Sequence, residues 1–302
     1  AFGGSASYDF QPSATSHHSV TPFKLTYSLL QRRTAEFDTI TQDNPALGRS
    51  LENQFIPSMG YTYTYDDASI TTKRNHLWWQ SSVTQAGLII DAAYAIAGKN
   101  FNKREKHLLG NKFAQFVKVT SEIRYNYDLG HRQHLVGRLM GGVAYSYGNA
   151  ITTPYSEQFY IGGANSIRAF TIRSIGPGSY HPTDSKYGYL DQTGDIKFEA
   201  NLEYRFPILG DLHGATFLDA GNVWLLRYDE SRPGGQLKWG RFLKDLALGT
   251  GVGLRYDLTF LVIRLDWGIG LHVPYDTGKK GYYNITNFKD GMGVHLAIGY
   301  PF

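Results

Sequence analysis

Hydrophobic and polar residues alternate along most of this chain of 302 residues. The clearest stretch is DIKFEANLEYRFP at 195–207, in which charged and amide side chains take the odd positions and apolar side chains most of the even ones. An alternation of period two held over this length predicts a β-strand with one apolar and one strongly polar face. The same reasoning predicts eleven strands, at 3–10, 19–36, 59–67, 75–96, 115–128, 134–149, 195–207, 214–226, 246–256, 258–271 and 293–302.

The predicted strands are long, and aromatic residues gather near their ends. Many run about 10 to 14 residues, whereas strands of soluble sheets average roughly 5–6. Strands that cross a membrane need about 9–11 residues and carry aromatic girdles at both interfaces. We therefore predict an all-β fold, a transmembrane antiparallel β-barrel; the alternative is a soluble sandwich or calyx whose core would supply the apolar face. The aromatic residues in question include Trp78, Trp79, Tyr125, Tyr145, Trp224 and Trp267.

The connections between the predicted strands alternate between short and long. Outer-membrane barrels have short periplasmic turns and long extracellular loops, so this alternation supports the barrel. An odd number of strands leaves an open sheet edge, which lipid does not tolerate. We therefore expect residues 1–302 to be the C-terminal portion of a larger barrel domain. The short connections are 11–18, 68–74, 129–133, 207–213 and 257–258, and the long ones are 37–56, 97–114, 150–193, 227–245 and 272–291.

Composition changes this picture little. The mean hydropathy is −0.33 and no stretch approaches the roughly 18 apolar residues of a membrane helix, but barrel strands show only alternation. The formal charge of +4 is spread along the chain without a basic block, so no nucleic-acid partner is expected. The absence of cysteine excludes disulfides, thiolate metal sites and a cysteine nucleophile. The start of the chain, AFGGSASYDFQ, lacks the basic and apolar regions of a signal peptide, which we expect to be removed already.

The long connection at 150–193 carries an unusual stretch, FYIGGANSIRAFTIRSIGPGSYHP. Together with FLDAGNVW (217–224), GTGVGLRYDL (249–258) and AIGYPF (297–302), its segment GGANSIRAF resembles the outer-membrane assembly factors of the BamA/TamA type, the bacterial surface antigen family. The resemblance covers most of the chain and is strongest from 115 to 302. The loop motif of that family is Val/Ile-Arg-Gly-Phe/Tyr, and here Ala169 stands where the family has glycine. The matching residues are Ile167, Arg168, Ala169 and Phe170.

The resemblance implies a 16-stranded barrel that follows periplasmic POTRA domains, with the motif in a loop folded back into the lumen. It also implies that Arg168 meets Glu203 and Asp219 on the two following strands. Strand geometry supports this independently: with a turn centred near Gly210, residue i faces about 420 − i, so Glu203 faces Phe217 and the two acids lie roughly 7–8 Å apart on one face. A guanidinium between two such carboxylates relieves their repulsion. The alternative is that Arg205 or Lys197 neutralises them and Arg168 is solvated.

The function implied by the resemblance is the insertion and folding of outer-membrane proteins, or a related translocation, in the bacterial outer membrane. Its partners would be the lipid bilayer, unfolded outer-membrane protein clients, periplasmic chaperones and accessory lipoproteins, with no cofactor. The last strand would form a lateral seam that offers its edge to a client strand. Its residues are Val294, Leu296, Ile298, Tyr300 and Phe302. The alternatives are a two-partner-type secretion pore that exports one dedicated protein, and a passive porin.

Other chemistry has little support in the sequence. Neither His17–His18 nor the pair His131 and His134 has a convincing cluster of carboxylates for a metal. The GTGVGL segment at 249–254 mimics a dinucleotide fingerprint without a following helix, and strand glycines more often allow close backbone approach. No G-x-S-x-G elbow occurs, and the nearest imitation of a catalytic group, Asp66 and Asp67 with His76, lies at a short turn. We expect no enzyme and no metal.

Overall fold

The dominant feature of the fold is one antiparallel sheet of eleven strands in the order β1-β2-β3-β4-β7-β8-β9-β10-β11-β12-β13. This computed structural model describes residues 2–28, 34, 41, 48, 53–70, 72–98, 106–108, 110–150, 152–182 and 188–302. The eleven predicted strands are confirmed, although parts of the predicted segments 19–36, 37–56, 68–74, 97–114 and 150–193 lie outside the described residues. The strands are β1 (Phe2–Ser13), β2 (Ser16–Ser28), β3 (Gln54–Asp66), β4 (His76–Ala86), β7 (Phe116–Gly130), β8 (Gln133–Ser146), β9 (Ile196–Leu209), β10 (Leu212–Trp224), β11 (Ala247–Asp257), β12 (Val262–His272) and β13 (Met292–Ile298).

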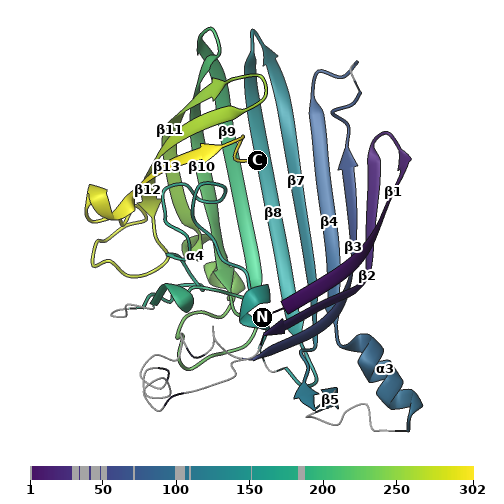
Figure 1. The fold of residues 1–302 in the computed structure, drawn as a ribbon. Coiled ribbons are helices and arrows are strands. Elements are labelled where there is room, and N and C mark those ends of the chain that lie inside the picture. Colours follow the sequence, from purple (N-terminus) through teal and green to yellow (C-terminus); the bar gives the residue numbers. More distant parts are fainter. Residues whose placement is uncertain are drawn as a thin grey trace.

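The sheet is rolled into a curved wall, with tight turns gathered at one end and long connections at the other (Figure 1). The turn between β9 and β10 comprises residues 210–211, and that between β7 and β8 residues 131–132. The connection between β8 and β9, by contrast, runs from 147 to 195. The predicted alternation of short and long connections is confirmed wherever both neighbouring strands are described.

The two faces of the wall have opposite chemistry. Polar and charged residues are buried on the inner face, as Glu199, Asn201 and Glu203 of β9 show. Large apolar side chains are exposed on the outer face, where Leu202 of the same strand is 45% exposed. Apolar side chains outside and charges inside are the arrangement that a lipid-facing barrel requires. Within the described ranges, no helix is long and apolar enough to cross a membrane.

One predicted strand was wrong in part. The segment 75–96 splits into β4 and the helix α3 (Leu88–Ile96). Gly87 separates the two with a φ of +83°, which ends the extended conformation. The sequence LIIDAAYAI that follows has no period of two and is rich in alanine, the best helix former.

The remaining elements are short and lie in the long connections. They are β5 (His107–Leu108), β6 (Asn111–Lys112), η1 (Tyr155–Glu157), η2 (Gly188–Leu190), η3 (Trp239–Arg241), α4 (Phe242–Asp245) and η4 (Phe288–Gly291).

The end of the chain also departs from the prediction. Val294, Leu296 and Ile298 are exposed on the outer face of β13, but the strand stops at Ile298, so Tyr300 and Phe302 are not part of it. Gly299 turns the chain with a φ of +80° and Pro301 has no N–H to donate to a ladder. The ring of Tyr300 therefore lies 4.2 Å from the guanidinium carbon of Arg205, and the ring of Phe302 lies 5.7 Å from that of Arg168. Figure 1 shows the C-terminus on the inner side of the curved sheet.

The loop between β8 and β9 supplies the main apolar cluster inside the wall. Its buried members come from the loop itself and from the strands that it covers. They are Ala144, Phe159, Ile161, Ile167, Ala169, Phe170, Ile175, Val223, Ala247 and Val273. The motif residues Ile167, Ala169 and Phe170 therefore anchor the loop by apolar burial, and Arg168 is the one charged residue among them.

Candidate functional site

A compact fold of the loop presents residues 167–170 to the inner face of the sheet. Gly162 and Gly163 have φ values of +95° and +91°, and a Cβ on Gly162 would lie 2.1 Å from the carbonyl oxygen of Thr171. Only glycine fits this position. The amide of Gly163 donates to the carbonyl of Phe170 at 2.7 Å, which closes the loop behind the motif.

Arg168 is bound to both acids that the sequence analysis named. Its Nε and Nη2 donate to the two carboxylate oxygens of Asp219 at 2.9 and 2.8 Å, and its own amide donates to Asp219 at 3.0 Å. Its Nη1 donates to Glu203. All three side chains are fully buried, so each charge is paired out of contact with water.

The register of the two strands explains why the acids meet one guanidinium. Glu203 faces Phe217 and Asn201 faces Asp219 across β9 and β10, as strand parity predicted. Asn201 completes the site, because its amide donates to Asp219 at 2.9 Å and to the carbonyl of Ser166 at 3.0 Å.

The main chain of the motif lies on glycines of three neighbouring strands. A Cβ on Gly268 would lie 2.4 Å from the carbonyl oxygen of Arg168, and a Cβ on Gly293 would lie at the same 2.4 Å. A Cβ on Gly249 would lie 2.5 Å from the Cβ of Ala169. We call Gly249, Gly268 and Gly293 the glycine patch. The expectation that the glycines of 249–254 allow close backbone approach is thus met at Gly249.

Ala169 fits without strain. It is not among the non-glycine residues with a positive φ, so an alanine in place of the family's glycine needs no special backbone conformation here. Its methyl group is 2% exposed and points at Gly249. The methyl group of Ala169 therefore occupies the space that a side chain at position 249 would fill.

A histidine of the last strand binds the motif directly. Nε2 of His295 in β13 lies 2.9 Å from the carbonyl oxygen of Arg168. Because a carbonyl oxygen only accepts, Nε2 carries the hydrogen in this bond. The loop motif is thereby linked to the strand that was expected to form the lateral seam.

Sequence reasoning missed much of the surrounding charge network. Glu203 also binds Arg205 at 2.7 Å and Arg255 at 3.2 Å, so Arg205 adds to Arg168 instead of replacing it. Asp266 binds Arg255 at 2.7 Å and Arg264 at 3.0 Å. The alternation in LRYD and VIRLDW already places these residues on the polar face of their strands.

Two further arginines hold the loop beside the motif. Arg264 donates to the carbonyl of Ala164 at 2.9 Å and also binds Asn165. Arg138 donates to the carbonyl of Asn165 at 3.2 Å and pairs with Glu122 at 2.7 Å. Lys197, the other alternative partner considered for the acids, pairs with Glu199 at 3.3 Å instead.

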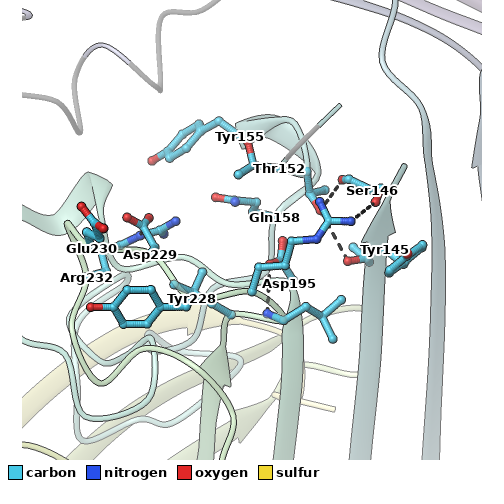
Figure 2. Close-up of a pocket in the computed structure, with 15 residues that line it drawn as sticks. Tyr145, Ser146, Thr152, Tyr155, Gln158, Asp195, Tyr228, Asp229, Glu230 and Arg232 are labelled. Carbon is cyan, nitrogen blue, oxygen red and sulfur yellow. Dashed lines mark hydrogen bonds and ion pairs between the residues drawn. The ribbon is translucent and has the colours of Figure 1, made fainter. Parts of the chain in front are cut away.

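A separate pocket of about 540 Å³ lies among the long connections (Figure 2). Figure 2 shows Thr152, Tyr155 and Gln158 on one side of it and Asp229, Glu230 and Arg232 on the other. Asp195 also lines the pocket and is 9% exposed, and its burial raises the pKa of its carboxyl above the ordinary value. The pocket shares no residue with the Arg168 site.

The histidines considered for metal are scattered. His17 and His18 lie on β2, His131 lies in a turn and His134 lies on β8. Nδ1 of His76 lies 3.6 Å from Asp67 at the short turn between β3 and β4. In the described part of the chain, no group of three or more histidine, aspartate and glutamate side chains is placed to hold a metal ion.

A rolled antiparallel sheet with an apolar outside, a charged inside and an inward-folded loop defines an outer-membrane β-barrel protein. The model of the Omp85 superfamily domain matches residues 2–300, and the chain therefore belongs to the Omp85 superfamily. It is a bacterial outer-membrane protein.

Several known proteins are similar to it. The outer membrane protein assembly factor BamA of Nitratidesulfovibrio vulgaris is 30% identical over 59% of this chain, and that of Neisseria meningitidis is 34% identical over 28%. The sorting and assembly machinery component 50 homolog A of Xenopus laevis is 32% identical over 46%. The matched regions span 20%, 11% and 29% of these relatives, respectively. The crystal structure of Haemophilus ducreyi BamA lacking POTRA domains 1–3 aligns with a TM-score of 0.46 and 14% identity, over 98% of this chain and 62% of that chain.

Proposed function

We propose that this protein inserts and folds other outer-membrane proteins, with the Arg168 site as a structural tether and no covalent chemistry. The observation that carries the proposal is the bond between the tether and the last strand, in which His295 of β13 donates to the carbonyl of Arg168. The names of similar proteins support it: one is an outer membrane protein assembly factor, and another is a component of a sorting and assembly machinery. We take Ile167, Arg168, Ala169 and Phe170 as the tether, with Glu203 and Asp219 as its luminal partners.

The exposed edge of β13 supplies the mechanism. Among the described strands, β13 pairs with β12 on one side only, so its other edge leaves backbone N–H and C=O groups for a further strand. Val294, Leu296 and Ile298 face outward, so an added client strand would enter at the lipid interface. Pairing to a sheet edge supplies main-chain hydrogen bonds without demanding a particular client sequence. The tether keeps β13 in position while the client strand pairs.

We further propose that residues 1–302 form the C-terminal portion of the barrel domain. β1 likewise pairs on one side only in the described sheet, and lipid cannot satisfy the backbone groups of a free edge, so further strands would close the barrel between β13 and β1 and would separate from β13 when a client strand pairs. Preceding strands and POTRA domains would complete the protein, and the partners would be the bilayer, unfolded clients, periplasmic chaperones and accessory lipoproteins.

Reconstitution of the full-length protein tests this function. Vesicles that contain it should accelerate the folding of a urea-denatured outer-membrane barrel relative to vesicles of the same lipid alone. Large, stable conductance together with export of one dedicated protein, and no acceleration of folding, would instead support the secretion pore. A loop cleaved by external protease along its whole length would support the passive porin.

A further inference from the structure

A pocket rich in basic side chains lies on the inner face of the wall, at the end where the short turns gather. It has a volume of about 340 Å³ and adjoins the Arg168 site, because two of its lining residues, Arg205 and Arg255, also bind Glu203. Its charged and titratable lining residues come from four strands and one turn, and we call them the cationic pocket: Arg132, His134, Arg205, His213, Arg255 and Asp257. Strand pairing places them on one face, because His134 faces Arg205 and His213 faces Arg255.

The charges of this region do not balance. The side chains that line the pocket, together with those joined to them through ion pairs, comprise five arginines and four carboxylates in the described part of the chain. They are Arg132, Arg168, Arg205, Arg255 and Arg264 against Glu203, Asp219, Asp257 and Asp266. Asp128, the carboxylate beside His134, already holds Arg74 and the amide of Gly130. The pocket therefore has an excess of positive charge.

Two buried side-chain nitrogens of the pocket residues lack partners. Arg255 is fully buried, and its Nε has no hydrogen-bond partner among the residues that the structure describes. Nδ1 of His134 is likewise buried and unpaired there. A buried polar group without a partner is destabilising unless a ligand or water satisfies it. Because the Nε of Arg255 can only donate, it indicates an acceptor that enters the pocket.

The position of Arg132 is fixed by an unusual turn. His131 and Arg132 both have positive φ values, 53° and 60°, in a turn where glycine or asparagine is usual. Nη1 of Arg132 donates to the carbonyl of Gly210 in the neighbouring turn at 3.0 Å, which holds the side chain at the rim of the pocket. Nη2 of Arg205 donates to the main-chain oxygen of Phe302 at 3.4 Å, so one arginine of the pocket already binds an oxygen atom of the chain itself.

We propose that the cationic pocket binds an oxyanion, either free phosphate or a carboxylate of a polypeptide. Guanidinium groups match the paired oxygens of both, and the ring nitrogens of the histidines add further polar contacts. Because the short turns of such barrels face the periplasm, the ligand enters from that side. This site goes beyond the proposed function and does not depend on whether the protein folds its clients or exports them.

Calorimetric titration of the full-length protein in lipid nanodiscs tests the site. The probes are inorganic phosphate, a short peptide with a free C-terminal carboxylate, and the same peptide with an amidated C-terminus. The variant Arg132→Gln/His213→Gln removes two donors outside the tether, and Lys238→Gln removes one exposed charge among the long connections as a matched control. We expect saturable binding of phosphate or of the free peptide, weakened about tenfold in the double variant and unchanged in the control.

The probes also distinguish the source of the oxyanion. Binding of the free peptide and not of its amide identifies a polypeptide carboxylate, and binding of phosphate alone identifies free phosphate. The proposal is overturned if none of the probes binds or if the amidated peptide binds as well as the free one. It is also overturned if the double variant binds phosphate like the wild type, because that result would mean an adventitious ion only. The difference in gel mobility between unheated and heated samples verifies that each variant is folded. If the double variant does not fold, the single variant Arg132→Gln is titrated with the same probes, and unchanged binding of phosphate overturns the proposal in the same way.

Discussion

The guanidinium carbon of Arg168 lies 3.5 Å from the centroid of the Phe217 ring, and Phe217 is the cross-strand partner of Glu203. The planar cation therefore stacks on a ring while its edges bind two carboxylates. Stacking and forked hydrogen bonding at once are properties of arginine that lysine lacks. The site is specific for arginine by shape as well as by charge.

Replacement of Arg168 by alanine should destabilise the protein by about 3–5 kcal/mol, because the buried Asp219 loses its arginine partner and the buried Glu203 loses one of the three arginines that bind it. Arg168→Lys should lose less, since it keeps the charge but not the fork. Unfolding in urea from lipid vesicles measures the difference. Arg241→Ala is the control, because Arg241 is 52% exposed in its pair with Asp245 and such pairs contribute about 0–1 kcal/mol. A stable Arg168→Ala variant that retains assembly activity would remove the tether from the mechanism.

Substitutions in the glycine patch should disturb the packing of the loop against the strands. Gly268→Ala places a methyl group 2.4 Å from the carbonyl oxygen of Arg168 and should destabilise the protein by about 1–3 kcal/mol through overpacking. Gly137→Ala should be neutral or stabilising by up to about 1 kcal/mol, because no atom lies within 4 Å of its added Cβ. The same urea titration compares the two. Equal effects of the two substitutions would show that the loop does not lie on the patch.

The bond from His295 to the loop predicts a local effect on the last strand. His295→Ala removes a hydrogen bond that contributes about 0.5–1.5 kcal/mol, so the amides of residues 292–298 should exchange their hydrogens several-fold faster. Leu296→Ala is the control on the same strand, because Leu296 faces outward and is 77% exposed. Exchange that is accelerated as strongly in Leu296→Ala as in His295→Ala would argue against the link.

The barrel strands and the proximity of the two acids were predictable from local patterns, whereas the binding of Arg168 to those acids was implied by the family resemblance. Strand parity alone placed Glu203 opposite Phe217, and the eleven strands followed from alternation. The helix α3 and the inward turn at Gly299 were missed, because apolar runs do not distinguish helix from strand and a single positive φ redirects a chain. The contact of His295 with the loop joins residues 127 positions apart and has no signature in a single sequence.

Asp195 predicts a dependence of stability on pH. Burial raises the pKa of its carboxyl in the folded state, so the folded protein binds the proton more tightly than the unfolded chain. The contribution of this group to stability is therefore lost as the pH rises from its unfolded value of about 3.9 through the raised folded value. Asp195→Asn should remove this loss and leave the variant relatively more stable at about pH 8 than at about pH 5.

Thermal unfolding of the wild type and of Asp195→Asn at both pH values measures the effect. Asp229→Asn is a control of opposite sign: burial opposes the shift, but hydrogen bonds from Ser231 and Arg232 lower the pKa of Asp229. Its replacement should lower stability at neutral pH. A pH response of Asp195→Asn identical to that of the wild type would show that Asp195 does not titrate as described.

The glycine patch holds the motif through its main chain and one methyl group, and every amino acid possesses a main chain. The space at this contact is therefore set by the strands more than by the loop: the methyl group of residue 169 fits because residue 249 has no side chain. In related sequences, larger residues at position 249 should accompany glycine at position 169. The strand residues that the loop contacts, more than the motif itself, then determine which loop sequences can pack against the inner face of the barrel.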